Sequence, residues 1–467
     1  MARINVPQKS HLKTYEGAPA RIINAEAQLR RSVMACLLWE KQFYEDGIDI
    51  AERITQLVPN VDGRTVSLIA NEARNQMHLR HVPLLITREM ARYPDHKTYV
   101  AATLEQIIQR ADELAEFAAI YWKDGKQPLS AQVKKGLARA FPKFDAYQLA
   151  KYDRPGAVRL RDVLFQCHAK PKDEKQAKVW KKLIDGTLEP PDTWEVGLSS
   201  GADKKETWTR LLKEKKMAAM AVLRNLRNFD RDSVDQDLVR ESLATMNISK
   251  VLPFRFIAAA RYAPQLEPEI EIAMMKGLKD HPKLKGHTVL LIDISGSMDV
   301  VLSRKSQMQR TDAASGLAIL AREICEQVDI FSFSNQLVRI PPRHGFALRD
   351  AIMDSQEHSG TYLGSAVKAI YGPKTMKIDG DQQWGYAIGP FRGQNLSPDR
   401  LIVITDEQSH DTIPNPKGIG YMINVGSYKN GVGYGPWIHI DGWSEAVIRY
   451  IQAMEDMENP TVKEELA

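Results

Sequence analysis

Cysteine is scarce in this chain: its 467 residues include only Cys36, Cys167 and Cys325, which lie far apart. An odd number of distant cysteines argues against a disulfide framework and against a cysteine-rich metal site. No stretch approaches the roughly 18 consecutive apolar residues of a membrane-spanning helix, and the first residues lack the apolar core of a signal peptide. We therefore expect a soluble cytoplasmic protein with no membrane partner.

Signatures of common catalytic sites are also absent. The chain has no GxxxxGK[ST] phosphate loop, no HExxH and no paired-cysteine zinc motif. The glycine-rich residues 431–435 lie outside a strand–loop–helix setting, which favours a turn over a phosphate cradle. We expect a protein that is not an enzyme.

Charge is distributed unevenly along the chain, although the formal net charge is only +5. Residues 285–467 carry 17 basic and 22 acidic side chains, whereas residues 1–284 carry 47 and 37. Residues 126–182 alone carry 15 basic and 5 acidic side chains. Concentrated positive charge of this kind favours a polyanionic partner.

The first 284 residues predict a helical domain. Prolines interrupt the apolar periodicity at intervals, and residues 184–206 predict a long connection. Consecutive helical pairs indicate a divergent HEAT-like array. The predicted helices cover residues 25–39, 49–57, 66–77, 84–93, 99–121, 130–141 and 208–225.

Residues 285–467 predict an α/β domain. Buried strands alternate with helices near 312–327, after 361 and over 444–457, which is typical of a doubly wound sheet. Such sheets bind ligands at the carboxyl ends of their strands. The predicted strands cover residues 288–294, 328–333, 337–340, 400–405, 420–425 and 437–440.

An Asp-x-Ser-x-Ser motif follows the first of these strands. Asp293, Ser295 and Ser297 would present a carboxylate and two hydroxyls at one edge of the sheet, and Thr361 and Asp406 would add two oxygen donors from other loops. Hard divalent cations, Mg²⁺ above all, prefer oxygen ligands. The alternative is that the hydroxyls cap loop and helix backbone and that no metal binds.

This order of residues resembles the metal-ion-dependent adhesion site of von Willebrand factor A domains. The resemblance implies a bound metal that leaves a coordination position for an acidic group of a partner, and it does not imply hydrolysis.

The basic stretch predicts outward-facing cations on two helices. Lys135 and Arg139, four residues apart, share a face, and Arg161 and His168, seven apart, stack on one exposed side of the next helix. Such cations could follow a phosphate backbone, with His168 stacking on or hydrogen-bonding to a base. The alternative is a charge run that only solvates a helix.

Several segments resemble TROVE-domain proteins, namely residues 39–47, 147–152, 160–171, 246–256 and 260–262. A TROVE domain followed by a von Willebrand A domain is the order of the Ro autoantigen and its bacterial relatives. The resemblance implies a monomeric, closed ring of HEAT-like pairs. Such rings bind small Y RNAs on a basic outer surface and hold single-stranded ends of misfolded RNA in a central hole.

The resemblance also implies that Lys151 and His168 contact RNA. The family has an arginine shortly after the lysine, and Arg154 stands one place from that position. The leading hypothesis is therefore an RNA-binding ring in RNA quality control or noncoding-RNA stability, which could be tethered through RNA to an exoribonuclease. The alternative is an adaptor whose metal site recruits an acidic protein partner.

Overall fold

The computed structural model divides the chain into two compact units, residues 25–39 with 47–211 and residues 1–24 with 40–46 and 212–467. None of the helices in its described part is long and apolar enough to cross a membrane. It describes residues 12–14, 16–20, 24–35, 47–75, 79–153, 156–199, 201, 203–248, 251, 253–278, 283–301, 308–375, 377–378, 391–426, 428, 431–433, 435–441, 447, 451 and 455.

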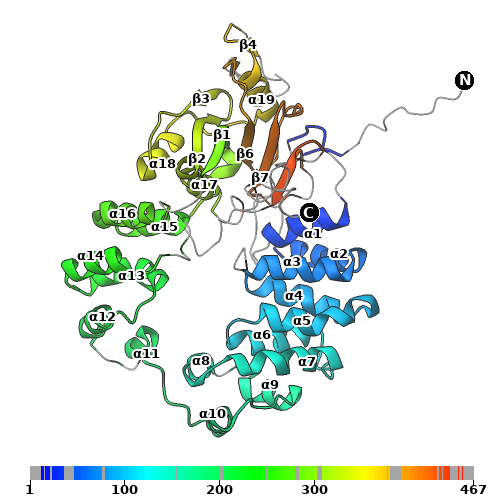
Figure 1. The fold of residues 1–467 in the computed structure, drawn as a ribbon, viewed down its shortest axis with the longest axis vertical. Helices are drawn as coiled ribbons and strands as arrows, with labels where there is room; N and C mark the ends of the chain where they lie inside the picture. The colour runs from blue at the N-terminus through cyan, green and yellow to red at the C-terminus, as the bar shows by residue number, and fades with distance from the viewer. Residues whose placement is uncertain are drawn as a thin grey trace, which may run out of the picture. The chain divides into compact units, whose positions relative to one another are not determined.

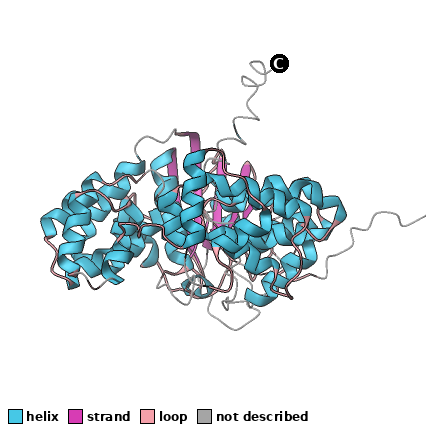
Figure 2. Ribbon diagram, turned by 90° about the horizontal axis from the view of Figure 1, so that it is seen from below, coloured by secondary structure: helices cyan, strands magenta, loops and turns pink. Residues whose placement is uncertain are grey.

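All the regular elements in the described part of the first unit are helices (Figure 1). Figure 2 shows that the strands of the described chain lie together in one region. Three short 3₁₀ turns each begin at or beside a proline, namely Pro59, Pro94 and Pro142, because proline fits the first turn of a helix but not its interior. The helices are α1 (Ala25–Ala35), α2 (Gly47–Leu57), α3 (Gly63–Asn75), α4 (His81–Met90), α5 (Lys97–Ile107), α6 (Asp112–Tyr121), α7 (Ala131–Ala140), α8 (Ala146–Tyr152), α9 (Leu160–Cys167), α10 (Glu174–Asp185), α11 (Trp194–Ser199) and α12 (Lys204–Lys213).

Helices α1 to α7 and α9 stack in two layers. In one layer α1, α3, α5, α7 and α9 follow one another in contact, and in the other α2, α4 and α6 do so. One continuous apolar core runs through them from Leu29 to Leu183. Each helix therefore buries its apolar face against its neighbours in the stack, and the predicted helical-repeat array is confirmed.

The structure corrects some of the predicted helix boundaries. Residues 99–121 form the two helices α5 and α6, because the Glu113 carboxylate accepts the backbone N–H groups of Gln109 and Arg110 and so begins a new helix. Residues 208–225 likewise divide between α12 and α13, and the connection predicted over 184–206 contains α11.

The second unit joins further helices to a sheet. Its helices are α13 (Ala219–Arg231), α14 (Gln236–Thr245), α15 (Pro253–Tyr262), α16 (Glu267–Leu278), α17 (Arg310–Ile324), α18 (Gly345–Met353) and α19 (Leu363–Tyr371). Its strands are β1 (Leu284–Asp293), β2 (Cys325–Phe333), β3 (Leu337–Arg339), β4 (Lys377–Ile378), β5 (Phe391–Arg392), β6 (Arg400–Thr405), β7 (Ile419–Asn424) and β8 (Ile438–Asp441).

Six strands form the main sheet in the order β3-β2-β1-β6-β7-β8, and all pair in parallel except β3. Val289 and Leu291 of β1 pack with α19 in one apolar cluster, while α17 packs on β1 from the side of Leu290 and Ile292. Helices thus cover both faces, and the predicted doubly wound sheet is confirmed (Figure 1).

Several elements of this unit lay beyond the sequence prediction. Helices α14, α15, α16 and α18 and the two-residue strands β4 and β5 have no counterpart among the predicted elements. Most of the helix predicted over 444–457 lies outside the described residues.

Candidate metal and nucleic-acid sites

Asp293 is the last residue of β1 and is fully buried. Because β1 and β6 run in parallel with Ile292 opposite Ile404, Asp293 lies level with Thr405 at the carboxyl edge of the sheet. Thr405 Oγ1 donates a hydrogen bond to Asp293 Oδ2 at 2.5 Å, and the backbone N–H of Ser295 donates to Oδ1 at 2.8 Å. The carboxylate is thereby fixed in one orientation.

The two serines of the motif turn their hydroxyls toward each other. Their Oγ atoms are 3.3 Å apart, with Ser295 buried and Ser297 partly exposed. The N–H of Gly296 between them donates to the carbonyl of Ser359 at 3.0 Å. This bond holds the loop that precedes α19 against the motif.

Thr361, in that loop, is buried and tied to the loop after β6. Its carbonyl accepts the backbone N–H of His410 at 2.8 Å and the hydroxyl of Ser409 at 3.2 Å. Asp411 accepts the N–H of Gly364 at 2.7 Å at the start of α19. The loops that carry Thr361 and Asp406 therefore hold each other in place.

Asp406 follows β6 and is also buried. The burial of Asp293 and the nearby charge of Asp406 together raise the pKa of Asp293 to about 7. Arg310, the first residue of α17, places Nη1 3.4 Å from Asp406 Oδ2 and 3.4 Å from the carbonyl of Ser297. Sequence reasoning did not find Arg310, since nothing in the sequence relates it to a residue 96 positions away.

The five predicted ligands lie together at this edge, and their chemistry fits a divalent cation. They offer two buried carboxylates and three hydroxyls, and no nitrogen or sulfur. Within the described residues no group of three or more His, Cys, Asp or Glu side chains forms a metal cluster of another type. A bound Mg²⁺ would supply positive charge to the Asp293–Asp406 pair and a position for an acidic ligand.

Two of the predicted RNA-binding residues lie on α7. Lys135 is exposed and has no ion pair among the described residues, whereas Arg139 Nη1 lies 3.5 Å from Glu105 Oε2 of α5. The two cations share a helix face as expected, yet only Lys135 offers an uncompensated charge.

The remaining predicted contacts lie on or beside α8 and α9. Lys151 Nζ lies 5.8 Å from the centre of the Tyr152 ring. Arg161 is 4.0 Å from Asp162. The expected shared helix face of Arg161 and His168 is wrong, because α9 ends at Cys167 and His168 is its C-cap in the left-handed region at φ 53°. Arg154 lies outside the described residues.

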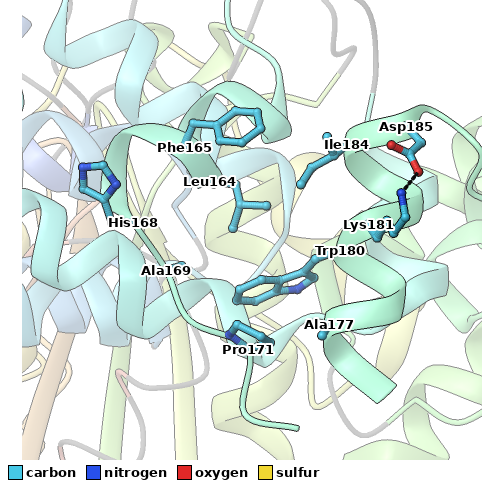
Figure 3. A pocket seen from close by; sticks show the side chains of 10 residues that line it. All are labelled: Leu164, Phe165, His168, Ala169, Pro171, Ala177, Trp180, Lys181, Ile184 and Asp185. Atoms are coloured by element: carbon cyan, nitrogen blue, oxygen red, sulfur yellow. Dashed lines mark hydrogen bonds and ion pairs between the residues drawn. The ribbon is translucent and has the colours of Figure 1, made fainter. Parts of the chain in front are cut away.

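Two hollows flank α9, and Phe165 lines both. The α10 hollow, about 520 Å³, lies between α9 and α10 and is lined by His168, Leu164, Phe165, Ala169, Pro171, Ala177, Trp180, Lys181, Ile184 and Asp185 (Figure 3). The α6 hollow, about 230 Å³, is lined by Trp122, Lys126, Ala157, Val158, Asp162, Phe165 and Gln166. Sequence reasoning missed both, although the buried stripe of α9 left Phe165 on its outer side.

The fold and the oxygen-donor site define a helical-repeat protein joined to a von Willebrand A-like domain. Residues 186–276, which run from the end of α10 into α16, match the family model of the TROVE domain. The resemblance to TROVE-domain proteins is thus confirmed over this segment, which includes residues 246–262 but not the resembling segments before 186.

The chain is also similar in fold to a solved structure, the Ro (RSR) protein of Deinococcus radiodurans. The TM-score is 0.57 at 16% sequence identity, and the match covers 90% of this chain and 97% of that chain. No curated protein matches the sequence.

Proposed function

We propose that this protein binds RNA without catalysing a reaction on it, as a TROVE-type protein of RNA quality control or noncoding-RNA stability. The observation that carries the proposal is the excess of cations over residues 126–182, with 15 basic and 5 acidic side chains. Phosphate charge makes such a surface attractive to any RNA.

Many of these cations lack a carboxylate partner. Among the described residues, six exposed lysines of this stretch form neither an ion pair nor a hydrogen bond to a carbonyl, so their charge is available to phosphates. They are Lys126, Lys135, Lys170, Lys172, Lys175 and Lys178. The last four lie just before or on α10. By contrast, the helices before residue 126 carry several arginines whose charge is already paired, such as Arg74 and Arg88.

The RNA classes come from the family resemblance. It favours a small Y-like RNA on the basic surface and the single-stranded ends of misfolded RNA in the central hole of such proteins. Selection would then depend on shape and accessible ends more than on base sequence. Tethering of an exoribonuclease through the bound RNA belongs to the same proposal.

A second candidate function rests on the buried pair of Asp293 and Asp406. With Mg²⁺ bound, this edge of the sheet would capture an acidic side chain of a protein partner. Capture that persists after nuclease treatment and is lost with EDTA or in Asp293→Ala would support this adaptor function.

A filter-binding titration at several salt concentrations tests the proposal. Its probe is a structured small RNA with a single-stranded 3′ tail, compared with a blunt duplex. We expect salt-sensitive binding that prefers the tailed RNA and weakens in the Lys151→Ala/His168→Ala double variant. The matched control is Lys97→Ala/His81→Ala, which removes one exposed lysine and one exposed histidine outside the basic stretch.

Equal weakening by both double variants, or binding that ignores the tail, would contradict the proposal. Absence of RNA binding by the unaltered protein would leave the adaptor function as the better candidate.

A further inference from the structure

Phe165 is an exposed aromatic residue on a helix whose other apolar residues are buried. It is 56% exposed, while Leu160, Val163, Leu164 and Cys167 of α9 are buried in the core of the helical unit. The phenylalanine therefore contributes little to packing. A large apolar ring left in water at this position calls for another explanation.

The ring stands between two hollows that each contain a tryptophan and a lysine. In the α10 hollow Phe165 shares the lining with Trp180 and Lys181 (Figure 3). In the α6 hollow it shares the lining with Trp122 and Lys126. Lys126 Nζ lies 5.5 Å from the centre of the Trp122 ring. Each hollow thus combines an aromatic wall with a lysine at its margin, and Lys181 of the α10 hollow is paired with Asp185 at 2.9 Å (Figure 3).

The charge around these hollows indicates what occupies them. All their lining residues except Trp122, Ile184 and Asp185 belong to the basic stretch 126–182. The net positive charge of that stretch is complementary to a polyanion. His168, at the end of α9, lies at one side of the α10 hollow (Figure 3). Aromatic walls within a cationic surface suit an unpaired nucleobase, which stacks on the ring while its phosphate stays near the lysines.

The volumes are compatible with this occupant. A water molecule takes up about 30 Å³ in the liquid. Even the smaller hollow, at about 230 Å³, has room for a pyrimidine or purine ring. A paired base in a duplex is stacked between its neighbours and could not enter.

We propose that Phe165 is a stacking platform for single-stranded RNA, with one unpaired base in the hollow on each side of its ring. The inference rests on the proposed RNA-binding function and adds a residue and a selection rule to it. Stacking on Phe165 would favour unpaired strands without reading their sequence, since every base has an aromatic face.

The test measures the affinity of the full chain for three probes of equal length. These are a single-stranded RNA, a strand of the same phosphate number in which every nucleotide is abasic, and a blunt duplex. Phe165→Ala and Phe165→Leu remove the aromatic ring, and Phe165→Tyr keeps it. Leu68→Ala, which truncates a 52% exposed apolar residue of α3, is the matched control.

We expect Phe165→Ala and Phe165→Leu to weaken binding of the single strand about tenfold or more. Binding of the abasic strand and of the duplex should change less than twofold, and Phe165→Tyr and Leu68→Ala should resemble the unaltered protein. The dependence of affinity on salt should keep its slope in Phe165→Ala, because no phosphate contact is lost.

Two results would overturn the inference while leaving RNA binding intact: full single-strand affinity in Phe165→Leu, or equal losses on all three probes. Failure of the unaltered protein to bind any RNA would overturn the proposed function as well, so the two failures are distinguishable.

Discussion

Arg310 and Asp406 meet at the carboxyl edge of the sheet, with Nη1 of the arginine 3.4 Å from Oδ2 of the aspartate. Both side chains are buried, at 3% and 1% exposure. The guanidinium therefore neutralises part of the charge that the two carboxylates of the site carry. A divalent cation bound there would compete with this resident positive charge.

Replacing Arg310 by Gln should tighten Mg²⁺ binding by about tenfold, or about 1.4 kcal/mol, because the competing positive charge is removed. The measurement is a thermal-melt titration with MgCl₂ after dialysis against EDTA, since a ligand that binds only the folded state raises the melting temperature. Arg322→Gln, a partly exposed arginine at the far end of the same helix, is the control and should leave the Mg²⁺ dependence unchanged.

Asp293→Ala should abolish the Mg²⁺-dependent rise in melting temperature altogether. If Arg310→Gln shows weaker Mg²⁺ binding than the unaltered protein, the arginine assists the metal and does not compete with it.

Glu113 holds the turn between α5 and α6. It is fully buried, its Oε1 pairs with Arg74 Nη2 at 2.8 Å, and its Oε2 accepts the N–H of Gln109 at 2.8 Å. Glu113→Ala leaves the buried guanidinium of Arg74 and two backbone N–H groups without their carboxylate acceptor. The free energy of unfolding should therefore fall by about 3–5 kcal/mol. Urea unfolding followed by circular dichroism measures this loss.

Glu105→Ala provides the comparison for Glu113. It removes an ion pair in which both side chains are more than 40% exposed, and it should cost no more than about 1 kcal/mol. Similar losses in the two variants would show that the Glu113 contacts are weak.

Asp124 should give the helical unit an acid-sensitive contact. Hydrogen bonds from Arg92 and Arg88 lower its pKa from 3.8 to about 2. A carboxylate with a lowered pKa in the folded state contributes stability that is complete above its unfolded pKa and is lost as the pH falls through the folded value. The difference in urea midpoint between the unaltered protein and Asp124→Asn should therefore be constant above about pH 4.5 and shrink toward pH 2.

The exposed pair of Glu26 and Arg30 serves as the control for Asp124. Glu26→Gln should change the midpoint little at any of these pH values. If the difference in urea midpoint between the unaltered protein and Asp124→Asn instead grows as the pH falls, the Asp124 carboxylate does not stabilise the folded chain.

Lys135 and Arg139 should differ in their effect on RNA, although they share a face of α7. Arg139 is partly neutralised by Glu105 at 3.5 Å, and Lys135 has no such partner in the described structure. Lys135→Ala should lower the slope of log affinity against log salt by about one, and Arg139→Ala by clearly less. Equal slopes in the two variants would show that the Glu105 pair does not persist when RNA is bound.

Much of this fold could be predicted from local sequence patterns. Every strand of the main sheet was predicted to within a few residues, because buried parallel strands appear as continuous apolar runs such as Val289 to Ile292. That the oxygen donors Asp293 and Asp406 lie at one edge of the sheet could be predicted for a related reason: residues that follow parallel strands gather at the same edge. The break between α5 and α6 could not be predicted, because it depends on the Glu113 carboxylate accepting the backbone N–H of Gln109, four residues earlier.

Contacts between distant residues were decided by the tertiary structure alone. Composition and periodicity determined that the chain has a helical array, a parallel sheet, a basic stretch and an oxygen-donor motif. They could not predict that Arg310 lies beside Asp406 or that Glu105 partly neutralises Arg139. Nor could they predict that Phe165 lies between two hollows. Periodicity reports only which face of an element is buried, whereas charge pairing and cavities depend on which elements then pack against that face.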